Sequence, residues 1–364
     1  MQVPYTRFSR HLAPIRNQLT AAFERVVDSG QYIQGPETAE FEKEFAVFCG
    51  TAWATGISNG TCSLHLLLKA IGVSSGDEVI TVPNSFVAST STIALAGALP
   101  VFVDVTDDLN IDAFKIEQAI TPRTRAIIPV HLAGRPANMP VIIDIARKYG
   151  LFVLEDAAQS VGAKLGHVRV GGWGNAASFS FHPLKNLHAF GDAGILTTND
   201  SEIVSHINLS KSHGLSSRDR CEFWSLNCRL DELQAALLRI QLRELDLWTE
   251  ERRRLAFRYH QLLSPFVRVP EEAVGEFHVY QTYVVQAERR DALQGFLRSN
   301  GVEAIVHYPT PIHMQPAAAG LNYRPEDFPM SLYLSNCILS LPLYPGLTNG
   351  EQDYVADLMA QFYK

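Results

Sequence analysis

The segment from Ser178 to Gly194, SFSFHPLKNLHAFGDAG, places a lysine where it could do chemistry. The chain has only eight lysines, and Lys185 lies between a run of small and aromatic residues and a Gly-Asp-Ala-Gly turn. A lysine amine that is removed from water beside apolar groups has a lowered pKa, and its neutral form attacks carbonyl carbon atoms. Lys185 is therefore a candidate nucleophile.

A carboxylate occupies a comparable position earlier in the chain. The apolar, β-rich segment 151–154 ends in Glu155-Asp156-Ala157-Ala158-Gln159, and a second such segment, 177–181, leads into Lys185. If these two expected strands are neighbours, Asp156 and Lys185 reach one cleft from adjacent strand ends. A buried aspartate needs a cationic partner, and a protonated pyridine nitrogen would serve as one.

A third feature indicates an anion site. Small and hydroxyl residues in 57–63, ISNGTCS, open an expected helix, and the free N–H groups and dipole of a helix N-terminus attract phosphate. Phe86, in the following Pro-Asn-Ser-Phe-Val segment, could stack on a flat ring.

A lysine, an acid and a phosphate site are the set that pyridoxal phosphate requires. Each piece also has a plainer interpretation, since Lys185 alone could be a surface residue, Asp156 a helix cap and Phe86 a core residue.

The surrounding pattern predicts the elements that position these residues. Apolar β-rich runs at 78–81, 100–104, 126–130, 151–154 and 177–181 alternate with helix-like stretches at 61–71, 85–96 and 139–149. Continuously apolar strands indicate a mostly parallel sheet with helices on both faces, and such sheets bind ligands at the carboxyl ends of their strands. A long helix is expected from 231 to about 262, followed by short mixed α+β segments. The sequence therefore predicts a large α/β domain, 1–245, and a smaller C-terminal α+β domain, 246–364.

Composition narrows the functional classes. A net charge of −7 and the lack of a basic cluster with interleaved aromatic residues argue against a nucleic-acid partner, since the basic run 252–254 follows two glutamates. No stretch approaches the roughly 18 apolar residues that a membrane helix needs. The five cysteines are scattered, without a CxxC pair, which favours free thiols and a cytoplasmic location. The histidines share no metal-ligand spacing, so no metal is expected.

At this point the chain resembles the DegT/DnrJ/EryC1/StrS family of sugar aminotransferases, which have the aspartate-aminotransferase fold (fold type I). The resemblance covers nearly the whole chain and is most specific in Glu155–Gln159 and Ser178–Gly194. It implies pyridoxal 5'-phosphate as cofactor, a homodimer with shared active sites, and small-molecule substrates. The roles that it implies are a Schiff base and proton transfer for Lys185, the pyridine nitrogen for Asp156, the phenolic oxygen for Gln159, ring stacking for Phe86, the phosphate for Gly60, Thr61 and Ser180, the partner subunit's phosphate for Asn227, and the donor carboxylate for Arg229.

The resemblance also bears on the substrate. Segments 185–194 and 227–236 are similar to the subgroup that aminates C3 of keto-hexoses, which are usually nucleotide-linked, with glutamate as the expected amino donor. Two departures are informative: Cys228 stands where many relatives have tyrosine, and Lys185 argues against the dehydrating branch, in which histidine replaces the lysine. A cyclitol ketone or a keto-sugar without a nucleotide stays open as the acceptor. So does a pyridoxal-phosphate-binding regulator, although the chain has no spare segment for a DNA-binding module.

Overall fold

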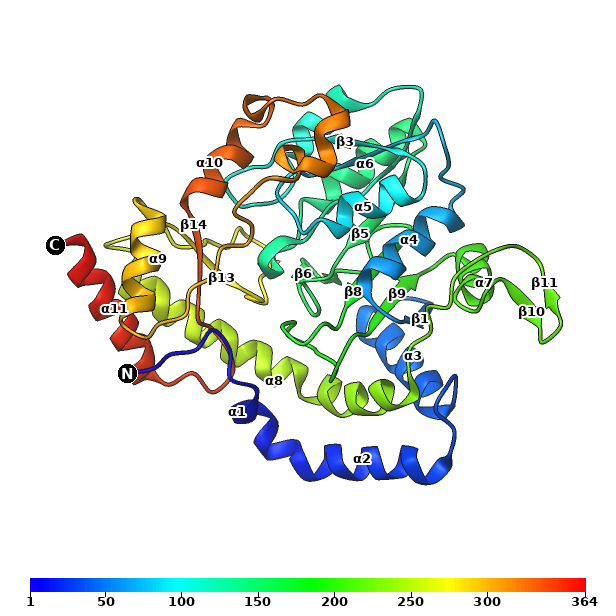
Figure 1. The fold of residues 1–364 in the computed structure, drawn as a ribbon, viewed down its shortest axis with the longest axis horizontal. Coiled ribbons are helices and arrows are strands. Elements are labelled where there is room, and N and C mark those ends of the chain that lie inside the picture. Colours follow the sequence, from blue (N-terminus) through cyan, green and yellow to red (C-terminus); the bar gives the residue numbers. More distant parts are fainter.

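The computed structural model describes residues 1–364, and a seven-stranded sheet forms the centre of the protein (Figure 1). Only one of its strands runs antiparallel to its neighbours, so the sheet is mostly parallel, as the sequence predicts. In order across the sheet the strands are β1 (Trp53–Ile57), the antiparallel β9 (Gly194–Thr198), β8 (Ala176–Ser180), β5 (Phe152–Asp156), β4 (Thr124–Ile127), β2 (Glu78–Thr81) and β3 (Leu99–Phe102).

Helices cover both faces of this sheet, because successive strand residues point to opposite sides. In β8, Ala176 faces a buried cluster formed with one set of helices, and Ala177 and Phe179 face another. The first set is α4 (Gly60–Ala70), α5 (Ala88–Leu95) and α7 (Ser201–Ser210). The second face carries α3 (Pro36–Cys49), α6 (Met139–Tyr149) and α8 (Glu232–Leu263). The predicted strands and helices are all present, with ends shifted by a few residues.

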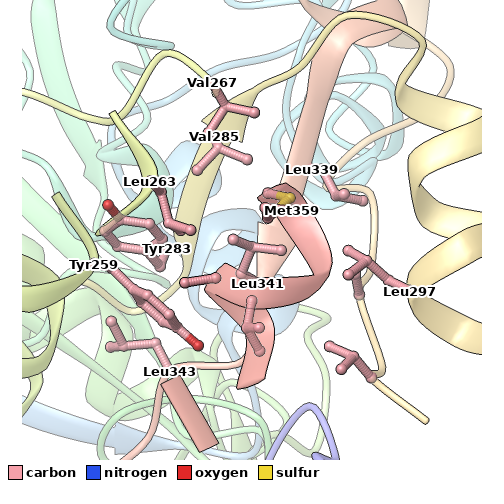
Figure 2. Packing of buried hydrophobic residues seen from close by; sticks show 14 of the residues in the cluster. Tyr259, Leu263, Val267, Tyr283, Val285, Leu297, Leu339, Leu341, Leu343 and Met359 are labelled. Atoms are coloured by element: carbon pink, nitrogen blue, oxygen red, sulfur yellow. The ribbon is translucent and has the colours of Figure 1, made fainter. Parts of the chain in front are cut away.

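The C-terminal part of the chain has its own core, shown in Figure 2. Tyr259 and Leu263, near the end of α8, pack against β13 (Tyr283–Gln286) and its antiparallel partner β14 (Ile338–Leu341). Helices α9 (Arg290–Ser299) and α11 (Asn349–Tyr363) close the cluster, which Val3 joins from the other end of the chain. The predicted domain boundary at 245/246 falls inside the continuous helix α8, and it stays a prediction.

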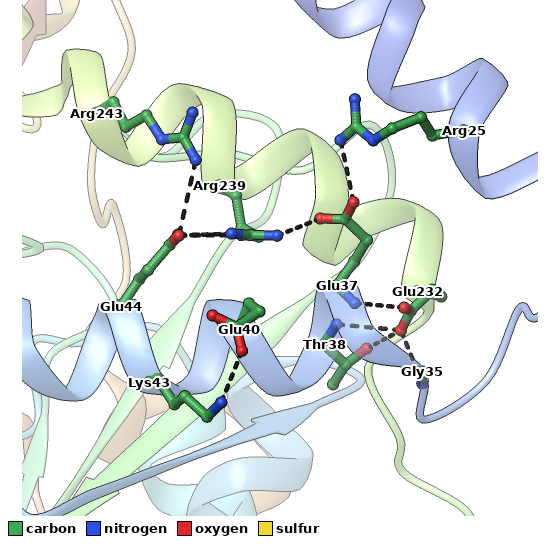
Figure 3. A network of polar contacts seen from close by, with 10 residues as sticks. All are labelled: Arg25, Gly35, Glu37, Thr38, Glu40, Lys43, Glu44, Glu232, Arg239 and Arg243. Carbon is green, nitrogen blue, oxygen red and sulfur yellow. Dashed lines mark hydrogen bonds and ion pairs between the residues drawn. The ribbon is translucent and has the colours of Figure 1, made fainter.

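Charged side chains tie α8 to two N-terminal helices, α2 (Arg16–Ser29) and α3 (Figure 3). Arg239 of α8 bridges Glu37 and Glu44 of α3 with N···O distances of 2.6 and 2.7 Å, and Arg25 of α2 pairs with Glu37 at 3.0 Å. The buried Glu232 accepts hydrogen bonds from backbone N–H groups in the first turn of α3 and so satisfies donors that have no partner inside their own helix. These contacts fix α3 against α8 and link α2 to α3.

The remaining elements lie at the periphery. Strands β10 (Leu215–Ser217) and β11 (Arg220–Cys221) form an arm that projects from the body of the protein in Figure 1. No helix combines the length and the apolar composition that crossing a bilayer requires. The other elements are α1 (Phe8–Leu12), α10 (Pro329–Cys337), β6 (Lys164–Leu165), β7 (Val168–Arg169) and β12 (Glu276–Phe277).

Candidate active site

Asp156 and Lys185 face one cavity at the carboxyl ends of adjacent strands. Strands β5 and β8 pair in parallel, with Asp156 opposite Ser178, and the turn after β8 carries Lys185. The cavity has a volume of about 610 Å³, and both side chains line it. Neighbouring parallel strands place their carboxyl ends together, which is how residues far apart in the sequence meet here. Other residues in its wall include Tyr5, Gly60, Thr61, Cys62, Ser85, Phe86, Gln159, Ser180, His182, Asp192, Gln281, His307 and Tyr308.

The Lys185 amine loses its proton more readily than an exposed lysine, although its charged form still prevails at pH 7. Burial lowers the pKa of Lys185 from 10.5 to about 8, and the Asp156 carboxylate opposes that shift only in part. The backbone holds the residue in place, because the Lys185 N–H donates to the His182 carbonyl at 2.8 Å. A neutral amine retains the lone pair that nucleophilic attack needs.

Asp156 is buried and held by two donors. The Ser89 hydroxyl donates to its Oδ2 at 2.7 Å, and the Ala158 N–H donates to its Oδ1 at 3.2 Å. Ser85 lies behind Ser89, with 2.8 Å between the two hydroxyl oxygens. Burial raises the pKa of Asp156 despite these bonds, so a cation facing the carboxylate would favour its ionised form. Sequence reasoning missed Ser89, because a serine in the first turn of a helix carries no signal that its side chain faces a site.

Glu155, the first residue of the Glu-Asp motif, points away from the cavity and has a structural role. Its carboxylate is fully buried and accepts backbone N–H bonds from Gly171, Trp173 and Gly174 at 2.8–2.9 Å. His131 Nε2 lies 3.0 Å from the same carboxylate, and its Nδ1 accepts from the Ala137 N–H, so Nε2 carries the proton and donates. Alternation along β5 separates this anchor from Asp156.

Gln159 links the cavity to two other segments. Its Oε1 accepts from the Ala133 N–H at 2.8 Å, and its Nε2 donates to the Tyr308 hydroxyl at 3.0 Å. The Tyr308 ring lies 5.9 Å from that of Phe86, which is 54% exposed on the opposite wall. Burial lowers the pKa of the neighbouring His307 to about 4, so this imidazole is neutral at physiological pH. Tyr308 and His307 come from the C-terminal part of the chain, and sequence analysis assigned neither residue a role in the site.

The first turn of α4, where the sequence predicts an anion cradle, lines the cavity. Asn59 caps the helix by accepting from the Cys62 N–H at 2.8 Å. Gly60 lies so close to β8 that an added Cβ would meet the Ser180 Cβ at 2.9 Å, and a Cβ on Gly194 would meet the Asn59 backbone at 2.6 Å. Both glycines are therefore required for the backbone to approach this closely, and Gly60 itself lines the cavity.

Asn227 and Arg229 are the two expected site residues that the structure does not bring into this cavity. They lie on a segment that forms isolated bridges, Asn227 with Ser212 and Arg229 with Ile57. Asn227 is exposed, and the Arg229 Nε is buried without a hydrogen-bond partner. Their roles stay predictions.

These features define an α/β enzyme built to hold a phosphorylated ring cofactor beside a reactive lysine. The residues fit pyridoxal phosphate: Asp156 is a buried carboxylate without a cationic partner in contact, Lys185 supplies the amine, and the α4 cradle supplies phosphate donors. The chain belongs to the DegT/DnrJ/EryC1/StrS aminotransferase family, whose model matches residues 14–360. Enzymes of this family depend on pyridoxal phosphate, so the family and cofactor expected from the sequence are confirmed.

Similar proteins cover the whole chain. A "Pleiotropic regulatory protein" of Geobacillus stearothermophilus is 40% identical, over 100% of this chain and 99% of that protein. A dTDP-3-amino-3,4,6-trideoxy-alpha-D-glucose transaminase of Streptomyces venezuelae is 38% identical, over 99% of this chain and 96% of that protein. The crystal structure of S. venezuelae DesV in complex with a ketimine intermediate superposes with a TM-score of 0.97 at 38% identity, and it covers 100% of this chain and 99% of that one. The predicted fold class and the transaminase class are confirmed.

Proposed function

We propose that this enzyme transfers an amino group from an amino acid, glutamate, to a nucleotide-linked 3-keto-hexose in the biosynthesis of an amino sugar. The observation that carries the proposal is the pairing of Lys185 and Asp156 in one cavity beside the α4 cradle. The transaminase of S. venezuelae, whose name specifies a 3-amino sugar carried by dTDP, supports the choice of substrate. A pyridoxal-phosphate-binding regulator would keep the same pocket, so turnover in the first experiment below distinguishes it from a transaminase.

The residues divide the binding work between them. Gly60, Thr61 and Ser180 would bind the phosphate, Gln159 Nε2 would donate to the phenolic oxygen, and Phe86 would cover one face of the ring. Asp156 would hold a proton on the pyridine nitrogen, because an ionised carboxylate stabilises the cation opposite it. Ser89 keeps Asp156 oriented through its bond to Oδ2. Lys185 would bond the cofactor through Nζ.

Proton transfer falls to Lys185. Pyridoxal phosphate, when bound, supplies the conjugated ring that draws electron density from the donor's Cα. The Lys185 amine, once free, accepts the proton from that carbon and delivers it across the same face, for which a pKa near the working pH is best suited. The neutral His307 and the hydroxyl of Tyr308 line the cavity as neutral hydrogen-bonding groups suited to a sugar's hydroxyl oxygens. The second half-reaction reverses these transfers onto the ketone, so ping-pong kinetics are expected.

We further infer that two chains share each active site. Asn227 is exposed and outside its own chain's cavity, and the neighbouring Trp224 is 95% exposed, which is unusual for so large an apolar side chain. A homodimer would cover this segment and bring Asn227 to the partner's phosphate, while Arg229 would bind the carboxylate of the donor. A cytoplasmic location agrees with the five free cysteines.

Two experiments test the proposal. In the first, the purified protein is mixed with glutamate, and the cofactor's absorbance is followed as nucleotide-linked 3-keto-sugars, free keto-sugars and cyclitol ketones are added in turn. Only the nucleotide-linked 3-keto-sugars should restore the starting spectrum rapidly. If only a cyclitol ketone restores the spectrum, the proposal of a nucleotide-linked 3-keto-hexose as substrate is refuted.

In the second, Lys185→Ala and Asn227→Ala chains, each impaired alone, are mixed. Random pairing should give heterodimers with one intact site and recover about a quarter of wild-type activity. Proven subunit exchange without recovery would place Asn227 in its own chain's site.

A further inference from the structure

Two cysteines meet at the wall of the cavity. Cys62 is in the first turn of α4 and lines the cavity, and Cys228 is 2% exposed in the segment that runs beside β1. Cys228 belongs to an apolar cluster against which Cys62 packs, and each thiol shifts the pKa of the other, so the two side chains are neighbours. None of the binding and proton-transfer roles described above uses either thiol.

The backbone holds this pair in place. The Ser58 N–H donates to the Cys228 carbonyl at 2.9 Å, and the Cys228 N–H donates to the Lys211 carbonyl at 2.9 Å. On the other side, the Asn59 cap fixes the Cys62 N–H at 2.8 Å. Two neighbouring thiols on segments that backbone bonds fix side by side can react without a large rearrangement, in contrast to cysteines that must first be brought together.

The two thiols differ in reactivity. The hydrogen bond from Cys228, with smaller contributions from Ser58 and Asn59, lowers the pKa of Cys62 against the opposing effect of burial. The same hydrogen bond and burial raise the pKa of Cys228. Cys62 also lies at the positive end of a helix, which favours a thiolate. Cys62 is therefore the nucleophile of the pair, and Cys228 is the thiol that retains its proton.

We propose that Cys62 and Cys228 form a disulfide in the wall of the active-site cavity when a hydroperoxide enters it. The Cys62 thiolate attacks the terminal oxygen of hydrogen peroxide, the O–O bond breaks, and with one proton the products are a sulfenic acid and water. The Cys228 sulfur then attacks the sulfenic sulfur, the S–O bond breaks, and the hydroxyl leaves with the Cys228 proton as a second water. The peroxide is reduced by two electrons, and the two thiols are oxidised to one disulfide.

The other three cysteines lack this arrangement. Cys221 is exposed on the β10–β11 arm, Cys337 is half-buried at the end of α10, and Cys49 is buried behind the sheet. Burial raises the pKa values of Cys49 and Cys337. Selective oxidation therefore singles out the pair of Cys62 and Cys228, with Cys221 as the natural control for simple exposure.

The disulfide would connect two segments that belong to the proposed cofactor site. Cys62 follows Gly60 and Thr61 in the cradle, and Cys228 separates Asn227 from Arg229. A covalent bond between them restricts both segments, so the oxidised protein should lose transaminase activity, and dithiothreitol should restore it. The oxidation itself requires only the two thiols, so it can be measured whether or not the proposed substrate is correct.

The test is a peroxide titration of the purified protein, followed by alkylation and peptide mass analysis without reduction. We expect a cross-linked pair of peptides containing Cys62 and Cys228, two hydrogen atoms lighter than their sum, to form before Cys221 or Cys337 is modified. The cross-link should be absent from Cys62→Ser and Cys228→Ser and should persist in Cys221→Ser. Earlier modification of Cys221, or overoxidation of Cys62 without a cross-link, would overturn the proposal.

A second pair of measurements tests the assigned roles of the two thiols, first in the wild-type protein and then in one variant. In the untreated wild-type protein, iodoacetamide at neutral pH should alkylate Cys62 faster than the more exposed Cys221. In the Cys228→Ser protein, its thermal unfolding checked first, peroxide should leave Cys62 as a sulfenic acid that dimedone traps. Slower alkylation of Cys62 than of Cys221, or no trapped adduct in a folded Cys228→Ser protein, would refute the assigned roles.

Discussion

The buried Lys185 amine should cost the protein stability, and this cost can be measured in the apoprotein. Burial lowers the pKa of Lys185 from 10.5 to about 8. Below pH 8 the amine is charged in both the folded and unfolded states, and the folded state bears the full penalty; above pH 10.5 it is neutral in both, and the penalty is absent. Stability should therefore rise with pH through this window. Replacing the amine with an apolar side chain of similar shape removes the dependence.

The expected magnitude follows from the size of the shift. At about 1.36 kcal/mol for each pKa unit, the full penalty would be about 3 kcal/mol. Because the amine lines a cavity open to water and is only partly buried, screening reduces this figure, and we expect about 2 kcal/mol. Lys185→Met should therefore be more stable than wild type by about 2 kcal/mol at pH 7, with the difference disappearing towards pH 10.5.

The assay is urea unfolding of both apoproteins at matched protein concentration, at several pH values from 6.5 to 10. The control is Lys69→Met, which removes a lysine amine from an exposed position on α4 and should show no such change in its difference from wild type. The refuting result is a constant difference between the unfolding free energies of wild type and Lys185→Met across this pH range. It would show that the amine is not desolvated in the folded protein.

Three further substitutions separate the roles of the site residues. Glu155→Gln should destabilise the protein by about 3 kcal/mol in urea unfolding, because an amide NH₂ cannot accept all four buried bonds, including the one from His131; a loss below about 1 kcal/mol would contradict this. Gly60→Ala should weaken pyridoxal phosphate binding about tenfold or more in a spectroscopic titration, because its Cβ would press on Ser180, and unchanged affinity would contradict the close approach. Asp156→Asn should retain the cofactor yet lower kcat about a thousandfold, since a neutral amide cannot hold the ring proton, and near-normal turnover would remove Asp156 from this role.

The sequence by itself determined the scaffold and its central pair of residues. Apolar runs that alternate with helical segments predict a mostly parallel sheet, and in such a sheet residues that follow neighbouring strands meet at one edge. On that ground Asp156 and Lys185 were expected to share one cleft if their two strands were neighbours, which the pairing of β5 with β8 confirms. The glycine and hydroxyl residues at 58–61 indicated the anion cradle. These inferences depend on local periodicity and on residues next to element ends, which a sequence records directly.

The tertiary structure decided what long-range packing controls. Either Glu155 or Asp156 could face the cavity. The choice depends on the sides of β5 on which α5 and the 171–174 loop pack, and the sequence does not specify those sides. The lowered pKa of Lys185 depends on burial by segments more than a hundred residues away, including that of Tyr308. The contact between Cys62 and Cys228 likewise exists only because the chain returns beside β1 after forming the whole sheet. Such contacts join positions with no local signal in common, so only the folded chain brings them together.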